Sequence, residues 1–301
     1  MSLVKLSEEV REAVANGTPV VGLESTIFSH LGLPSPANHE ALERSTAAVR
    51  AQGAVPAITA ILDGIPRVGL EDNEFDRILG PADKTAERDI SVAIAQRRSV
   101  GATTVSASLA LCAEAGIPVF ATGGIGGVHL GSELTGDISA DLGAIALHPV
   151  LTVCAGAKAF LDIAKTLEFL ETESVPVLGY QTDDFPMFYA RSSGAKVPAR
   201  VDSAAEVAAI LAQRIVWDQG GVLLGVPVPE ADAIAGHEIQ DAIETALARA
   251  RNVTGAAITP FVLEQIAKIT EGRSIPANLA LAENNASVAA QVAAELAKLV
   301  G

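Results

Sequence analysis

One lysine stands out because it follows an apolar run that is typical of a buried strand. Lys158 comes after residues 150–154 and the small residues Ala-Gly-Ala, where the sequence predicts the start of a helix. An apolar surround and a helix N-terminus both disfavour an ammonium ion, and a Schiff-base nucleophile must be a neutral amine. The same placement suits a lysine that pairs with a phosphate, so the sequence leaves both roles open.

Three carboxylates occur in comparable places. Glu24 ends the predicted strand 19–23, where it could act as a general acid and base or could cap the following turn. Asp137 and Asp141 are four residues apart, and carboxylate oxygens are hard ligands that suit Mg²⁺ or Mn²⁺. A plainer interpretation makes Asp137 a helix cap and leaves Asp141 in solvent.

A glycine-rich stretch, ATGGIGG (121–127), follows the predicted strand 117–120. Glycines let backbone N–H groups approach a ligand, and open α/β sheets bind ligands at the carboxyl ends of their strands. The stretch is not a dinucleotide fingerprint, because His129 replaces the third glycine, and the chain contains no Gly-Lys dipeptide of a P-loop. It is either a backbone cradle, for example for a phosphate, or a mobile turn.

The elements that position these residues alternate between strands and helices. Continuous apolar runs predict strands at 19–23, 55–62, 117–120, 150–154, 175–179 and 221–226. We therefore expect an α/β fold, with a mostly parallel sheet covered by helices on both faces and a helical C-terminal quarter. Residues 1–301 are expected to form a single domain. Among the helices, one should begin at Thr103 or Thr104, one should span 159–172, and the last should begin near Ala286.

The composition argues against several classes of protein. A net charge of −15 predicts no nucleic-acid partner and no anionic membrane surface. The chain has no apolar run of about 18 residues and no signal-peptide pattern, so we expect a cytoplasmic protein. Cys112 and Cys154 lie in apolar patterns and are expected to be small buried side chains.

Taken together, these stretches resemble the pseudouridine-5′-phosphate glycosidase family, also called indigoidine-synthase-A-like. The resemblance runs in order over nearly the whole chain. Its segments are GLEST (22–26), QGAVPA (52–57), GATTV (101–105), FATGGIGGVHLG (120–131), DISAD (137–141), CAGAK (154–158), GYQTDDFP (179–186), TPF (259–261) and ENNA (283–286).

The resemblance implies reversible cleavage of the C–C glycosidic bond of pseudouridine 5′-phosphate to uracil and ribose 5-phosphate, in nucleotide catabolism. It implies one divalent ion per subunit, typically Mn²⁺ with Mg²⁺ as a substitute, and a homotrimer. Lys158 would form an imine with C1′ of the ring-opened ribose, Glu24 would donate and accept protons, and Asp137 would bind the metal. The implied substrate contacts are Lys84, Val105, Ser139, Ala140 and Asp141.

The chemistry fits that reaction. A C-glycoside has no leaving oxygen to protonate, so the two-carboxylate scheme of O-glycosidases fails. Opening the sugar exposes C1′ to an amine, and the iminium formed there lets uracil C5 be protonated and leave. From the residues alone, a Schiff-base aldolase acting on a sugar phosphate, or a non-catalytic sugar-phosphate sensor, remains an alternative.

One segment departs from the family pattern. The family usually reads Lys-Val-Ser-Arg-Arg-Asp where residues 84–89 here read Lys-Thr-Ala-Glu-Arg-Asp. Glu87 therefore replaces an arginine, and its effect on phosphate binding is left open.

Overall fold

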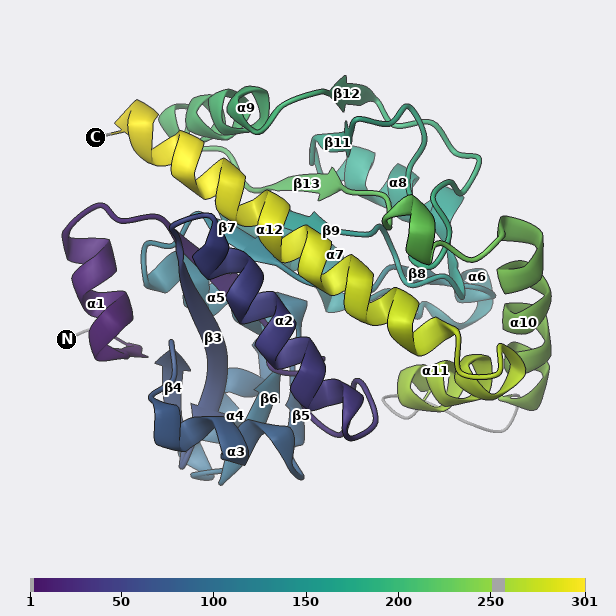
Figure 1. The fold of residues 1–301 in the computed structure, drawn as a ribbon, viewed down its shortest axis with the longest axis horizontal. Helices are drawn as coiled ribbons and strands as arrows, with labels where there is room; N and C mark the ends of the chain where they lie inside the picture. Colours follow the sequence, from purple (N-terminus) through teal and green to yellow (C-terminus); the bar gives the residue numbers. More distant parts are fainter. Residues whose placement is uncertain (1–2, 251–257, 301) are drawn as a thin grey trace.

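A large, mostly parallel sheet forms the centre of the molecule. The computed structural model describes residues 3–250 and 258–300 (Figure 1). Parallel pairing joins six central strands in the spatial order β3 (Val55–Leu62), β2 (Val20–Leu23), β7 (Val119–Ala121), β9 (Leu151–Cys154), β13 (Val222–Gly225) and β11 (Val177–Tyr180). Two short strands extend the sheet, β1 (Lys5–Leu6) beyond β4 (Ile65–Val68) and β12 (Ala199–Val201) beside β11. The predicted mostly parallel sheet is confirmed.

The antiparallel part of the sheet forms along β3. This strand is eight residues long, and β2 pairs with only its first half. Its second half pairs antiparallel with β4 (Ile65–Val68) and β6 (Val100–Thr103), and β5 (Asp83–Thr85) lies beside β6. Strands β2 and β6 therefore point toward one another. Their ends are joined by hydrogen bonds from Thr26 N to Thr103 O and from Thr103 N to Ser25 Oγ.

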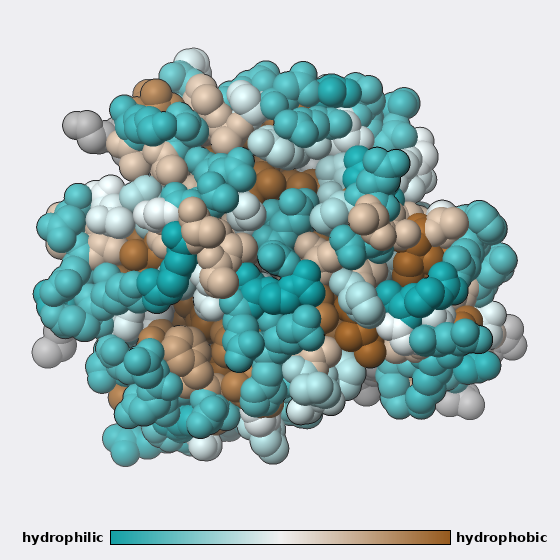
Figure 2. Space-filling view, viewed as in Figure 1, coloured by the Kyte–Doolittle hydropathy of each residue, from teal (hydrophilic) through white to brown (hydrophobic). Residues whose placement is uncertain are grey.

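Helices cover both faces, as predicted. One face packs against α2 (Ala37–Ala51), α9 (Ala204–Val216) and α12 (Ser274–Val300), with α12 crossing in front of the sheet in Figure 1. The other face carries α1 (Glu8–Ala15), α5 (Val105–Glu114) and α7 (Ala140–Leu147), and α8 (Ile163–Thr172) packs on α7. The face drawn in Figure 2 is mostly hydrophilic, because the apolar sides of α2 and α12 are turned toward the sheet.

Shorter elements complete the fold. Helices α3 (Phe75–Leu79) and α4 (Ile90–Ala95) flank β5. Strands β8 (Val128–His129) and β10 (Leu161–Asp162) form a small antiparallel pair, and α6 (Ser132–Thr135) follows β8. Both cysteines are buried and free, as expected. In the described part of the chain, no helix is both long and apolar enough to cross a membrane.

The C-terminal quarter is helical, as predicted, and consists of α10 (Gly236–Arg249), α11 (Ile258–Ile269) and α12. The start of α12 differs from the prediction, because the helix begins at residue 274 rather than near Ala286. Asparagines suggest helix caps in a sequence. Here Asn284 and Asn285 lie inside the helix and bond the carbonyls of Pro227 and Thr122 in other segments.

Candidate active site

A cavity of about 470 Å³ opens where the carboxyl ends of β2, β7 and β9 meet the end of β6. Each strand end delivers a loop to its wall, so residues far apart in the sequence share one space. Every site residue named from the sequence lines this cavity, namely Glu24, Lys84, Val105, Asp137, Ser139, Ala140, Asp141 and Lys158. The structure thus brings together residues from five different segments of the chain.

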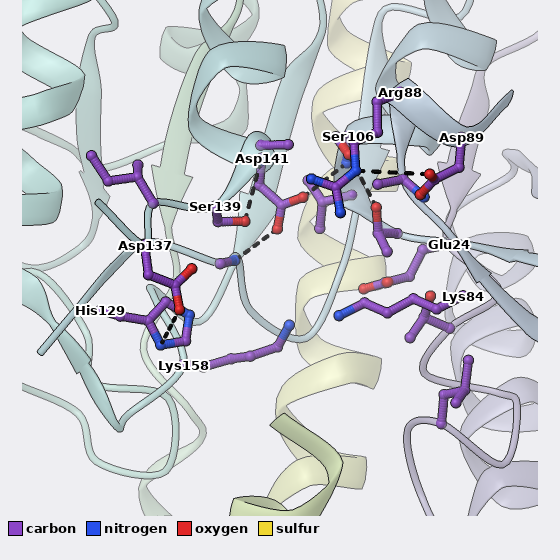
Figure 3. Close-up of a pocket in the computed structure, with 18 of the residues that line it drawn as sticks. Glu24, Lys84, Arg88, Asp89, Ser106, His129, Asp137, Ser139, Asp141 and Lys158 are labelled. Atoms are coloured by element: carbon purple, nitrogen blue, oxygen red, sulfur yellow. Dashed lines mark hydrogen bonds and ion pairs between the residues drawn. The ribbon is translucent and has the colours of Figure 1, made fainter. Parts of the chain in front are cut away.

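Three charged side chains converge in the middle of the cavity. Figure 3 shows Glu24, Lys84 and Lys158 pointing toward one another. Glu24 comes from the end of β2, Lys84 from β5, and Lys158 from the loop after β9. A carboxyl group facing two amines is an arrangement that can form a covalent amine adduct and move protons beside it.

Glu24 has the properties of an acid and base rather than of a turn cap. Its side chain is buried, and it accepts a hydrogen bond from the Thr122 hydroxyl at the end of β7. Burial raises the pKa of Glu24 to about 7, against the opposing effects of the Lys158 charge and the Thr122 hydrogen bond. Both protonation states of this carboxyl are therefore populated at neutral pH, which suits a group that gives and takes protons.

Lys158 does not stand at a helix N-terminus, so that part of the prediction is wrong. Strand β9 ends at Cys154 and α8 begins only at Ile163. Between them, Ile125 N donates to Gly156 O, and Lys158 N donates to Ile125 O. These backbone bonds pair the segment 156–158 with the glycine-rich loop, and this pairing aims the lysine into the cavity in place of a helix.

Positively charged side chains lie around the cavity. Burial lowers the pKa of Lys84, and the neighbouring Lys158 charge lowers it further, against the attraction of Asp141 and Glu24. Arg88 and Arg98 also line the wall, so four cations face a space that could take an anion, although the carboxylates of Glu24, Asp89, Asp137 and Asp141 line it as well. The departure at Glu87 does not enter this space, because its carboxylate lies 2.9 Å from Nε2 of His148 and the residue does not line the cavity.

Asp141 is a buried brace, which contradicts the interpretation of a solvated side chain. Its Oδ1 accepts from Ser106 N at 3.0 Å and its Oδ2 accepts from Gly126 N at 2.8 Å. Ser139, rather than Asp137, caps α7 by accepting from Asp141 N. The carboxylate therefore ties the start of α5 to the glycine-rich loop.

Asp137 offers its carboxylate to the cavity. The side chain is 48% exposed, and Nδ1 of His129 lies 3.8 Å from its Oδ2. Burial lowers the pKa of His129, although the Asp137 charge opposes this. Within residues 3–250 and 258–300, no three His, Cys, Asp or Glu side chains converge on one point. The donor set fits a hard ion that keeps most of its waters and binds through one carboxylate.

The glycine-rich stretch serves close packing more than anion binding. Gly126 lines the cavity, but its N–H is bonded to Asp141 and the N–H of Ile125 is bonded to Gly156. A Cβ atom at Gly126 would lie 2.2 Å from Ser139 Oγ. This glycine is therefore needed for the close approach of Ser139. Because these two N–H groups are already bonded, the cationic side chains are better placed than the loop to bind a phosphate.

Four further residues belong to the site and were not singled out from the sequence. Thr122 bonds Glu24, Ser106 bonds Asp141, His129 lies beside Asp137, and Arg98 lines the cationic wall. Thr122 and His129 lie within the segment 120–131, which carries part of the resemblance. Arg98 gave no signal, because it follows Gln96 and Arg97 in a short polar run that is typical of a solvated turn. In the TPF segment, the side chains of Thr259 and Pro260 lie outside the described residues.

Comparison with known proteins finds relatives that match nearly the whole chain. Residues 9–295 match the family model of indigoidine synthase A like proteins. The chain is 49% identical to the pseudouridine-5′-phosphate glycosidase of Sorangium cellulosum, over 98% of this chain and 94% of that protein. It is 46% identical to the pseudouridine-5′-phosphate glycosidase of Arabidopsis thaliana, over 99% of this chain and 92% of that protein.

Two solved structures share the fold over their full length. The prealnumycin C-glycosynthase AlnA, in complex with ribulose 5-phosphate, matches with a TM-score of 0.90 at 36% identity, covering 99% of this chain and 98% of that one. An indigoidine synthase A-like protein from Thermotoga maritima matches with a TM-score of 0.87 at 35% identity, covering 99% and 98% of the two chains.

Proposed function

Because the chain belongs to the indigoidine synthase A-like family, we propose that it acts as a pseudouridine-5′-phosphate glycosidase. The reaction is reversible cleavage of the bond between uracil C5 and ribose C1′, giving uracil and ribose 5-phosphate. The observation that carries the proposal is the convergence of Lys158 and Glu24 in a cavity lined by further cations. Relatives nearly half identical over the whole chain carry this activity in their names.

Substrate binding uses the charged wall. In the proposed complex the phosphate lies toward Arg88 and Arg98, with Lys84 between the phosphate and the reacting carbon. The remaining substrate contacts are assigned to the start of α5 and to the cap of α7, at Val105, Ser139, Ala140 and Asp141. Binding energy from the phosphate helps to hold C1′ beside the reacting amine.

Covalent chemistry falls to Lys158. Its nitrogen forms a bond to C1′ as the C1′–O4′ bond breaks, and O4′ takes the proton that the amine loses, which opens the ring. Glu24 then delivers a proton to uracil C5. As the C1′–C5 bond breaks, the nitrogen lone pair forms a C1′=N iminium, and uracil departs with the added proton. Water hydrolyses the iminium, which releases ribose 5-phosphate and restores the lysine. Glu24, with its pKa near 7, recovers a proton between turnovers.

Asp137 is proposed to hold a hydrated Mn²⁺, with Mg²⁺ as a substitute. The support is its carboxylate at the cavity wall, which is half exposed and lies 3.8 Å from His129 Nδ1. When bound, such an ion supplies positive charge that stabilises negative charge on substrate oxygens. The residues of the chain carry the bond-making and proton-transfer steps.

The reaction is tested most directly in the direction of synthesis. Purified protein, Mn²⁺, uracil and ribose 5-phosphate should give pseudouridine 5′-phosphate, identified by mass and chromatography. Product formation must depend on uracil, since an aldolase would consume the sugar phosphate without it. Excess EDTA after dialysis should stop the reaction and Mn²⁺ should restore it. Full turnover in EDTA would remove the metal from the proposal, and no product under any condition would refute the function.

A homotrimer in the cytoplasm is proposed on the resemblance to the family. Light scattering in solution should give a mass of about three times the 30.8 kDa chain. A monomeric or dimeric mass would contradict the trimer.

A further inference from the structure

Asn285, in the middle of α12, reaches from the helix layer to the end of β7, next to Glu24. Its Nδ2 donates to Thr122 O at 2.8 Å and to Gly123 O at 3.3 Å. The side chain is fully buried, and its Oδ1 has no hydrogen-bond partner among the described residues. Burying an unpaired amide oxygen is costly, so this placement needs a reason beyond packing.

Thr122 lies between Asn285 and Glu24. Its N–H donates to Val153 O of β9, its carbonyl accepts from Asn285, and its hydroxyl donates to Glu24 Oε1. The backbone of Thr122 is thus held on both sides, which leaves little freedom in the direction of the hydroxyl. Neighbouring members of the same ENNA motif are used elsewhere, since Glu283 pairs with Arg44 and Asn284 bonds Pro227 O.

We propose that Asn285 is a positioning residue that acts through Thr122, so that the Thr122 hydroxyl holds one oxygen of Glu24 and leaves the other to the cavity. The inference rests on the proposed function, in which Glu24 carries the proton to and from uracil. Asn285 itself does not line the cavity, so it has no direct contact with the reacting atoms.

Charged groups from three other elements also face Glu24. Lys158, from the loop after β9, and Lys84, from β5, favour the carboxylate, whereas Asp141, from α7, favours the protonated form. The Thr122 hydrogen bond adds to the two lysines, because a hydroxyl donor stabilises the carboxylate. Removing that donor should therefore raise the pKa of Glu24 above its present value of about 7.

The test titrates Glu24 directly by carbon NMR of side-chain-labelled glutamate, with the signal assigned by its loss in Glu24→Gln. Thr122→Val removes the hydroxyl at nearly constant shape and should raise the titration midpoint by about one pH unit. Asn285→Leu should raise the midpoint by a smaller amount. Thr122→Ser, which keeps the hydroxyl, should have the same midpoint as the parent. Asn284→Leu is the matched control on the same helix and should leave the midpoint unchanged.

Turnover gives a second readout. Glu24 must be protonated to deliver its proton in cleavage, so kcat/KM should fall as the pH rises above about 7. In Thr122→Val and Asn285→Leu this alkaline limb should move to higher pH with the NMR midpoint. The NMR titration needs no substrate, so a parent protein that fails to cleave pseudouridine 5′-phosphate would refute the proposed function separately.

Two results would overturn the inference. One is an unshifted midpoint in Thr122→Val. The other is an Asn285→Leu protein that loses activity while its midpoint and alkaline limb stay in place, which is the behaviour of a purely structural residue. If Asn285→Leu does not fold, as judged by circular dichroism, Asn285→Ala takes its place and is interpreted in the same way.

Discussion

At the scale of single residues, the cavity contains two lysines that could attack an aldehyde. Lys158 and Lys84 point into the same space beside Glu24, and burial lowers the pKa of Lys84. Charge alone therefore does not say which amine becomes covalently attached. Position decides between them: Lys158 is fixed by the loop pairing of 156–158, whereas Lys84 lies on the same side as Arg88 and Arg98.

The prediction is that borohydride, added with ribose 5-phosphate, traps the sugar on Lys158. The imine is the species that borohydride reduces, so a stable adduct should be found on the peptide carrying residues 154–158. Lys158→Arg should lose both the adduct and catalysis, because a guanidinium stays protonated and does not add to an aldehyde. The measurement is peptide mass spectrometry together with a turnover assay.

Lys84→Arg is the matched variant, since it keeps the charge in the cationic wall. It should still form the adduct at Lys158, with weaker binding of the sugar phosphate. Labelling at Lys84 in the parent protein, or an active Lys158→Arg protein, would move the nucleophile away from Lys158.

At the scale of elements, the sequence predicted the strand ends well and the loops after them poorly. Continuous apolar runs identify β2, β3, β7 and β9, because a strand buried on both faces needs no alternation. Strand β6 (Val100–Thr103) was missed, since four residues that include Gly and Thr carry little apolar signal. Its end was instead assigned to the helix that begins at Val105.

The orientation of the Lys158 side chain was missed for a different reason. The helix expected after Lys158 follows from local propensity. In the structure, the backbone of this segment is instead hydrogen-bonded to the glycine-rich loop, about thirty residues earlier in the chain. Such pairing between distant segments leaves no periodic pattern in either one. The same holds for Asp141, whose carboxylate accepts hydrogen bonds from two backbone N–H groups in other segments.

A substitution of Gly156 tests the loop that aims Lys158. Gly156 has a φ of +90°, and a Cβ atom there would lie 2.1 Å from Pro186 O. Gly156→Ala should therefore destabilise the protein by roughly 2–4 kcal/mol and lower kcat through displacement of Lys158. Urea unfolding and turnover measure the two effects.

Gly143→Ala is the control for this substitution. Gly143 lies inside α7, and a Cβ atom there meets nothing within 4 Å. Alanine should leave activity unchanged and stabilise the helix by roughly 0.5–1 kcal/mol. A Gly156→Ala protein with the stability and activity of the parent would show that the loop conformation is not needed to aim Lys158.

At the scale of the whole molecule, a chain with a net charge of −15 places four of its cations around one cavity. Lys84, Arg88, Arg98 and Lys158 come from three separate segments, so their gathering could not be recognised from the spacing of charges in the sequence. The surrounding negative charge disfavours anions in general. An anionic substrate must therefore be held by this local group, which makes the phosphate the feature that the molecule should recognise.

The last prediction is that pseudouridine without its phosphate is a poor substrate. Each charge-assisted hydrogen bond to a phosphate contributes about 1.5–3 kcal/mol, so the loss of two of them should lower kcat/KM by roughly 10²–10⁴-fold. Arg98→Gln should lower the ratio of kcat/KM for the nucleotide to kcat/KM for the nucleoside, because it lowers kcat/KM only for the nucleotide. Arg200→Gln, which removes a surface arginine paired with Asp202 outside the cavity, should leave that ratio unchanged. Steady-state kinetics on both substrates measures the ratio. Equal efficiency on nucleotide and nucleoside, or a ratio that Arg98→Gln leaves intact, would show that the cationic wall does not hold the phosphate.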